Sequence, residues 1–196
     1  YLHDPEGLYL FQLGKIGDKG PGAGCDGPIS KITRDLQIHE LGENPVTLID
    51  VKAGLEDSAR GVITSMDWII SVVDPNNASI QIAADIKSLI SQIRAGESPA
   101  TQHLENIELI EKAKNIYKEA KIKDSFVILN KITNKKTEDY IIEKLNEKGL
   151  KPIGVVYDDP SISLSWLEGT SLEGTEAKKN IMDALEKLER KIKDQY

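Results

Sequence analysis

Asp50 and Gly54 are the residues whose types and spacing first suggest chemistry. They follow an aliphatic run, residues 46–49, that is typical of a buried parallel strand. A carboxylate at the carboxyl edge of such a strand can hold a water molecule on Mg²⁺, and a glycine there lets a backbone N–H come close to a phosphate. The alternative is a strand that ends in a capping Asp and a turn glycine, and at this point both interpretations stay open.

A glycine-rich stretch, residues 17–28, contains the only cysteine of the chain, Cys25. The stretch is too rich in glycine for a helix and is long enough to be a functional loop. A single cysteine excludes an internal disulfide framework and fits a reducing cytoplasm. His3, His39 and His103 show no ligand spacing, so we expect them to be surface or cap residues.

Hydrophobic periodicity predicts the elements that must position these residues. The predicted strands are residues 8–14, 46–50, 68–73, 125–129 and 152–157. The predicted helices are residues 29–41, 60–66, 79–94, 104–120, 137–148 and 173–193. Strands that alternate with helices predict an α/β fold with a mostly parallel sheet and helices on both faces.

The composition describes an ordinary globular protein of 196 residues with 39% hydrophobic and 29% charged residues. This length predicts a single domain, residues 1–196. Residues 79–121 are predicted to form a helical hairpin, which is either an insertion or a plain hairpin packed on the sheet. The net charge of −7 argues against a nucleic-acid surface, which needs a basic stripe. No stretch approaches about 20 consecutive apolar residues, so we expect no membrane partner.

Four stretches, in this order, resemble one family of proteins. Residues 50–61 match the pattern Asp-x-x-Ala-Gly-x-Glu followed by Arg-Gly, and residues 73–79 resemble the strand-to-helix turn after it. Asn130-Lys131 and residues 154–169 resemble a base-reading pair and a closing strand with its base-side loop. The family is that of the deviant-Walker P-loop ATPases: carbon monoxide dehydrogenase accessory (nickel-insertion) ATPases, nitrogenase iron protein and the septum-site-determining ATPases.

The resemblance implies roles for individual residues. Asp50 would hold the Mg²⁺ shell through water, and the Gly54 N–H would sense the γ-phosphate of ATP. Asn130, Lys131 and Asp159 would bind the nucleotide, and the Asn130 amide offers both a donor and an acceptor to a purine edge. The alternatives are a polar strand terminus for Asn130-Lys131 and a helix cap for Asp159. Tyr157 stands where the family usually has proline.

The family's phosphate-binding loop, Gly-x-x-x-x-Gly-Lys-Ser/Thr, does not occur in this chain. We therefore expect the sequence to be roughly the C-terminal two-thirds of a longer ATPase, without its P-loop and its first strand. This fragment should not hydrolyse ATP alone.

Cys25 corresponds to a loop that bears a Cys-x-Cys pair in the accessory ATPases, where it resembles a metal site shared across a dimer. Gly27 replaces the second cysteine here, so two chains would bring two thiolates rather than the four of a closed tetrahedral site. Two-coordinate binding of Ni²⁺ or Zn²⁺, or added ligands such as Asp26, stays open. The alternative is an ordinary loop thiol at a dimer interface.

The resemblance implies an ATP-binding, dimerising nucleotide-switch ATPase in metal-cofactor maturation, with nickel insertion into carbon monoxide dehydrogenase as its task. The alternative is a non-catalytic, P-loop-less scaffold that docks partner proteins on the same sheet. The acidic balance and the Cys25 loop disfavour a third interpretation, a DNA-segregation ATPase. The patterns around Trp68 and Trp166 predict that both rings lie in the core.

Overall fold

The structure is a computed structural model that describes residues 2–3, 7–11, 26–36, 45–97 and 106–194. These residues divide into two compact units, Tyr1–Ser65 and Met66–Tyr196, and each unit is described by itself. Among the described residues, every helix is too short or too polar to cross a lipid bilayer.

The second unit is built on a parallel sheet with the strand order β3-β4-β5. Its strands are β3 (Trp68–Val73), β4 (Asp124–Ile132) and β5 (Pro152–Tyr157). Both pairings are parallel, which confirms the predicted α/β class. The middle strand is buried on both faces from Phe126 to Leu129, as expected for a strand between two layers of helices.

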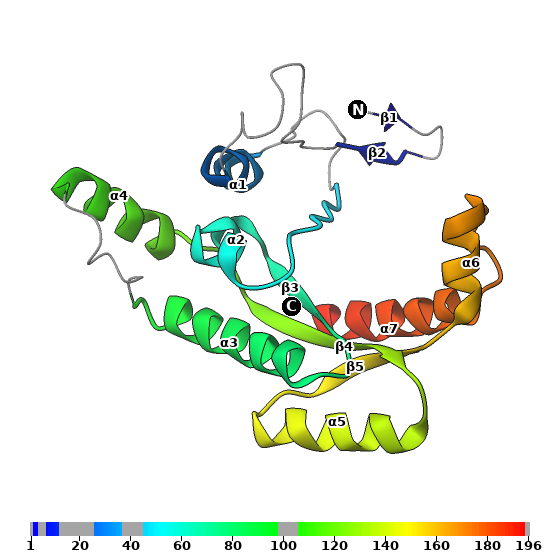
Figure 1. The fold of residues 1–196 in the computed structure, drawn as a ribbon. Helices are drawn as coiled ribbons and strands as arrows, with labels where there is room; N and C mark the ends of the chain where they lie inside the picture. Colours follow the sequence, from blue (N-terminus) through cyan, green and yellow to red (C-terminus); the bar gives the residue numbers. More distant parts are fainter. Residues whose placement is uncertain (1, 4–6, 12–25, 37–44, 98–105, 195–196) are drawn as a thin grey trace. The chain divides into compact units, whose positions relative to one another are not determined.

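Helices cover both faces of this sheet (Figure 1). They are α3 (Asn77–Arg94) and α5 (Lys135–Glu147) on one face and α7 (Glu176–Lys193) on the other. The unit also contains α4 (Ile107–Lys118) and α6 (Pro160–Glu168). On one face, α3 and α5 pack on a core that includes Val73, Val127, Leu129, Ile141 and Leu145. On the other face, α7 packs on a second core that includes Phe126, Ile128, Val156, Ala177 and Ala184.

The contact between β5 and α7 is unusually close. A Cβ atom added to Gly154 would lie 2.4 Å from the Ala184 Cβ atom, and Ala184 is fully buried. A side chain at residue 154 would therefore push α7 off the sheet, because interiors are packed too tightly to absorb such an overlap.

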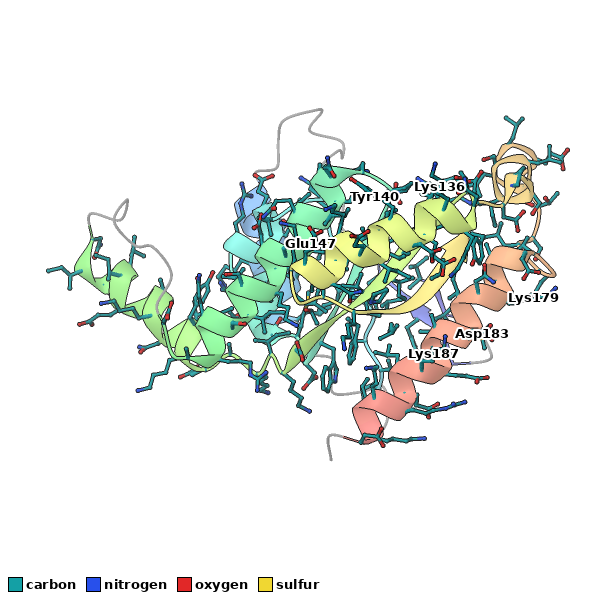
Figure 2. The ribbon with its side chains drawn as sticks, turned by 90° about the horizontal axis from the view of Figure 1, so that it is seen from below. Lys136, Tyr140, Glu147, Lys179, Asp183 and Lys187 are labelled. Carbon is teal, nitrogen blue, oxygen red and sulfur yellow. The ribbon has the colours of Figure 1, made fainter. Side chains whose placement is uncertain are left out.

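The outer sides of the helices are solvent-exposed. Figure 2 labels exposed residues of α5 (Lys136, Tyr140, Glu147) and of α7 (Lys179, Asp183, Lys187). Trp68 packs against the second core with its ring 5.3 Å from that of Phe126, as predicted. The prediction for Trp166 is wrong, because this residue is 78% exposed on α6.

The first unit contains β1 (Leu2–His3), β2 (Tyr9–Leu10), α1 (Asp26–Asp35), α2 (Glu56–Ala59) and the 3-10 helix η1 (Val62–Ser65). β1 and β2 form an antiparallel ribbon. Val62 and Ile63 are each 1% exposed, so η1 is well buried. α1 begins at Asp26, inside the stretch that was expected to be a loop, and residues 37–41 of the expected helix lie outside the described part.

The predicted strand over residues 46–50 is wrong for the described structure. Residues 45–52 have no regular secondary structure, and Val46 and Leu48 are 98% and 87% exposed. An extended apolar segment becomes a strand only when a neighbouring strand takes up its backbone hydrogen bonds. Within the described residues, no strand pairs with residues 46–50.

Candidate functional site

The carboxyl ends of β3 and β4 bring three polar side chains together. Asp74 directly follows β3, and Asn130 and Lys131 lie near the end of β4. The Asn130 Nδ2 atom donates to the Asp74 Oδ1 atom at 2.8 Å, and the Lys131 Nζ atom lies 3.1 Å from Oδ2 of the same carboxylate. This is the edge at which ligands bind in open α/β sheets.

The backbone at Asn130 and Lys131 departs from a regular strand. The register between β4 and β5 shifts between Leu129 and Ile132, and Lys131 has a φ angle of 54°. A non-glycine residue in this left-handed region is uncommon and often marks a functional site. The irregularity turns the polar pair toward the end of β3. After it, the pairing of β4 with β5 resumes at Ile132, whose carbonyl accepts from the Asp158 N–H at 2.9 Å.

Tyr157, at the end of β5, is hydrogen-bonded to Glu138 of α5. Its hydroxyl donates to the Glu138 Oε2 atom at 2.5 Å, and the Lys135 Nζ atom lies 2.7 Å from Oε1. The Lys135 ammonium and the Tyr157 hydroxyl together hold the pKa of the buried Glu138 carboxyl below its usual range. The same hydrogen bond raises the pKa of Tyr157. The phenol is therefore committed to a protein partner.

Asp159 occupies the loop after β5, where both of its carboxylate oxygens accept hydrogen bonds from helix starts. Oδ1 accepts from the Ser161 N–H at 3.0 Å and from the Ser161 hydroxyl, and Oδ2 accepts from the Ala177 N–H at 3.2 Å. These bonds, led by the Ser161 hydroxyl, hold the pKa of Asp159 below its usual value. The structure thus confirms the alternative that Asp159 caps a helix. Nucleotide binding by Asp159 stays a prediction.

Asp50 and Gly54 lie in the first unit. Asp50 is exposed, and Gly54 has a φ angle of 101°, a backbone conformation that L-residues rarely adopt. The turn that carries Gly54 is held by Asp57 of α2. The Asp57 Oδ2 atom accepts from the Lys52 N–H at 3.2 Å, and Oδ1 accepts from the Ser30 hydroxyl of α1 at 3.0 Å.

The structure places Asn130 and Lys131 at the end of a strand, as predicted. It adds two carboxylates that the sequence did not single out: Asp74 beside Asn130 and Lys131, and Asp57 beside the turn that carries Gly54. For Asp74 the sequence predicts a strand end and a strand-to-helix turn, without a side-chain partner. A signal for it was available, since adjacent parallel strands must bring their carboxyl ends to one edge. Asp57 had no such signal, because its partners on α1 and in the turn are set by tertiary packing.

Cys25, the predicted metal ligand, lies outside the described residues. Within the described residues, no group of three or more His, Cys, Asp or Glu side chains is placed to hold a metal ion. An exposed carboxylate such as Asp50 has the oxygen chemistry that Mg²⁺ prefers, and it fits a contact through water.

The chain is similar to two uncharacterized ATP-binding proteins of Methanocaldococcus jannaschii. It is 27% identical to one over 173 residues, which cover 88% of this chain and 56% of that protein. It is 28% identical to the other over 165 residues, which cover 82% of this chain and 52% of that protein. The chain thus spans about half the length of these relatives.

A third relative is the carbon monoxide dehydrogenase accessory protein CooC of Rhodospirillum rubrum. The two are 34% identical over 87 residues, which cover 44% of this chain and 32% of CooC. No family model matches the chain, and no solved structure matches it. The parallel sheet is compatible with a P-loop NTPase-like fold, and the chain's homologues are ATP-binding proteins and a carbon monoxide dehydrogenase accessory protein.

Proposed function

We propose that the protein to which this chain belongs is a dimeric nucleotide-switch ATPase that acts in metal-cofactor maturation, with nickel loading of carbon monoxide dehydrogenase as its task. Asn130 and Lys131 bind the purine base of ATP. Asp50 holds the Mg²⁺ shell through water, and the Gly54 N–H senses the γ-phosphate. Mg²⁺ supplies charge neutralisation on the phosphates when it is bound.

The observation that carries the proposal is the polar pair Asn130 and Lys131, with Lys131 in the left-handed region, at the ligand-binding edge of the sheet. The chain's homologues include ATP-binding proteins. Asn130 is half-buried and projects from a distorted strand end next to the loop after β5. An amide in that place reads a base edge, as single hydrogen-bonding groups do in ligand sites. The match to a carbon monoxide dehydrogenase accessory protein supports carbon monoxide dehydrogenase as the client.

A contact within the first unit supports a coupling between the nucleotide and the cysteine. Asp57 binds the turn that carries Gly54 and also binds Ser30 of α1, the helix that begins directly after Cys25. Ser30 is 3% exposed, so this hydrogen bond is shielded from water. A change in the Gly54 turn on hydrolysis would therefore pull on α1 and move the thiol.

Isothermal titration calorimetry of the full-length protein with ATP and Mg²⁺ tests the proposal. We expect one ATP per protomer, and we expect Asp50→Asn to lower Mg²⁺-dependent hydrolysis about 10- to 100-fold, the range for groups that contact a metal through its shell. Asp67→Asn is the matched control. Asp67 is an exposed carboxylate at the opposite end of β3, so its substitution should leave hydrolysis unchanged.

Absence of ATP–Mg²⁺ binding by the full-length protein would overturn the proposal and favour the partner-docking scaffold. Dimerisation and nickel binding are tested independently of ATP binding. Light scattering with and without ATP measures the dimer, and nickel bound per protomer before and after Cys25→Ser measures the metal site.

A further inference from the structure

Asp74 uses both oxygens of its carboxylate to hold the residues proposed to read the base. Oδ1 accepts from the Asn130 amide and Oδ2 pairs with the Lys131 ammonium. The Asp74 side chain is 35% exposed and the Asn130 contact is partly buried, so this hydrogen bond is partly shielded from water. One carboxylate at the end of β3 thus fixes two consecutive side chains of β4.

This contact determines which way round the Asn130 amide lies. An ionised carboxylate only accepts hydrogen bonds, so the amide must turn its NH₂ group toward Asp74. Rotating the amide by half a turn would place its oxygen next to the Asp74 Oδ1 atom, and two acceptors at that distance repel. In the described part of the chain no hydrogen bond is directed at the Asn130 oxygen, which is therefore left to a ligand.

An amide held in this orientation distinguishes the two purines. Adenine presents an amino donor at position 6 beside the N7 acceptor, whereas guanine presents two acceptors, O6 and N7. The fixed Asn130 oxygen accepts from the adenine amino group, and the second hydrogen of its NH₂ group can reach N7. Guanine would need two donors, and the Asn130 amide can supply them only by an adjustment that Asp74 opposes.

We propose that Asp74 is a specificity-determining positioning residue that makes this edge select adenine over guanine nucleotides. The inference rests on the proposed function and deepens it, because it assigns the base preference to a residue that does not itself contact the base. The left-handed backbone at Lys131 supports the assignment, since it turns Asn130 and Lys131 together toward Asp74.

The test is calorimetric titration of the full-length protein with ATP and with GTP, each with Mg²⁺, in wild type and Asp74→Asn. The isosteric amide can donate as well as accept, so it no longer fixes the Asn130 orientation. We expect the ratio of ATP to GTP affinity to fall about tenfold. Asp74→Ser, whose hydroxyl also donates or accepts, should shift the ratio in the same direction.

The ratio of ATP to GTP affinity distinguishes a change in the Asn130 orientation from damage to the fold, because a damaged fold lowers both affinities alike. Lys131→Met is the matched variant. It removes the ammonium that pairs with the Asp74 Oδ2 atom and leaves the hydrogen bond between Asn130 and Oδ1 in place. This variant should lower the affinity for ATP and for GTP by the same factor, so that the ratio of the two affinities is unchanged. A ratio unchanged in both Asp74 variants, in a protein that binds ATP, overturns this inference and leaves the proposed function standing. A wild-type protein that binds neither nucleotide overturns both.

Discussion

Two segments of this chain have nearly the same sequence pattern and very different surroundings. Residues 46–50 and residues 68–74 are both aliphatic runs that end in an aspartate. The second forms β3, pairs with β4 along its whole length and buries Val73 completely. The first is irregular, and Val46 and Leu48 are almost fully exposed. The comparison teaches that a strand is a property of a pair of segments, because its hydrogen bonds and its covered faces come from a neighbour.

The largest test of this comparison is a pair of leucine truncations. Leu129→Ala should lower the free energy of unfolding by about 2–5 kcal/mol, because it leaves a cavity in a fully buried place on β4. Leu48→Ala in the same chain should change it by less than about 0.5 kcal/mol, because that side chain is already in water. Urea unfolding followed by circular dichroism measures both.

Equal destabilisation by the two truncations would contradict the comparison. In the full-length protein, a Leu48→Ala effect that approaches the Leu129→Ala effect would show that a further segment covers residues 46–50.

A pair of glycine substitutions should lower the free energy of unfolding by less. It distinguishes a glycine required by close packing, Gly154, from a glycine required by its backbone conformation, Gly54. Gly154→Ala should destabilise the second unit by about 1–3 kcal/mol, because the new methyl group would overlap Ala184 on α7. Gly54→Ala strains only its own turn, since its φ angle is 101° and no atom lies within 4 Å of the added Cβ. The melting of the second unit, followed by differential scanning calorimetry, should therefore shift for Gly154→Ala alone.

Adding Ala184→Gly to Gly154→Ala should recover part of the lost stability, because it removes the atom that the new methyl group meets. An additive result in this double-mutant cycle would show that the close contact is relieved in some other way.

The smallest effect concerns the edge at which β3 and its neighbours end. Tyr157→Phe should destabilise the protein at pH 7 by less than the core substitutions above, because Glu138 loses the Tyr157 hydroxyl and keeps the Lys135 ammonium, and because Tyr157 is partly exposed. The pKa of Glu138 is lowered in the folded state, so its stabilising contribution is complete above its ordinary value of 4.5 and is lost as the pH falls through the folded pKa.

Wild type should therefore lose stability more steeply than Tyr157→Phe below pH 4.5, and the two unfolding curves should converge in acid. A difference between them that stays constant from pH 7 to pH 3 would show that the phenol acts by packing and not through the carboxylate.

Much of the second unit was predictable from the sequence because its strands and helices are each other's partners. The apolar periods of residues 68–73 and 79–94 match elements that pack on one another. The pairing of Asn130 with Asp74 was less accessible, because it depends on a register shift and a left-handed residue that no local pattern indicates. The prediction for the segment around Asp50 failed for a different reason: its local pattern is clear, but within the described residues no strand pairs with it.

The carboxylate of Asp159 has a mechanical consequence. Because it binds the first turn of α6 and the first turn of α7, the starts of the two helices must shift together when the loop after β5 shifts. The 18 residues of α7 form a rigid rod about 27 Å long, which runs along β5 to the opposite end of the sheet. There Lys191 and Asp194 line a cavity of about 400 Å³ beside the start of β4. A displacement at one end of the sheet would thus change the shape of a hollow at the other, without any change in the strands between them.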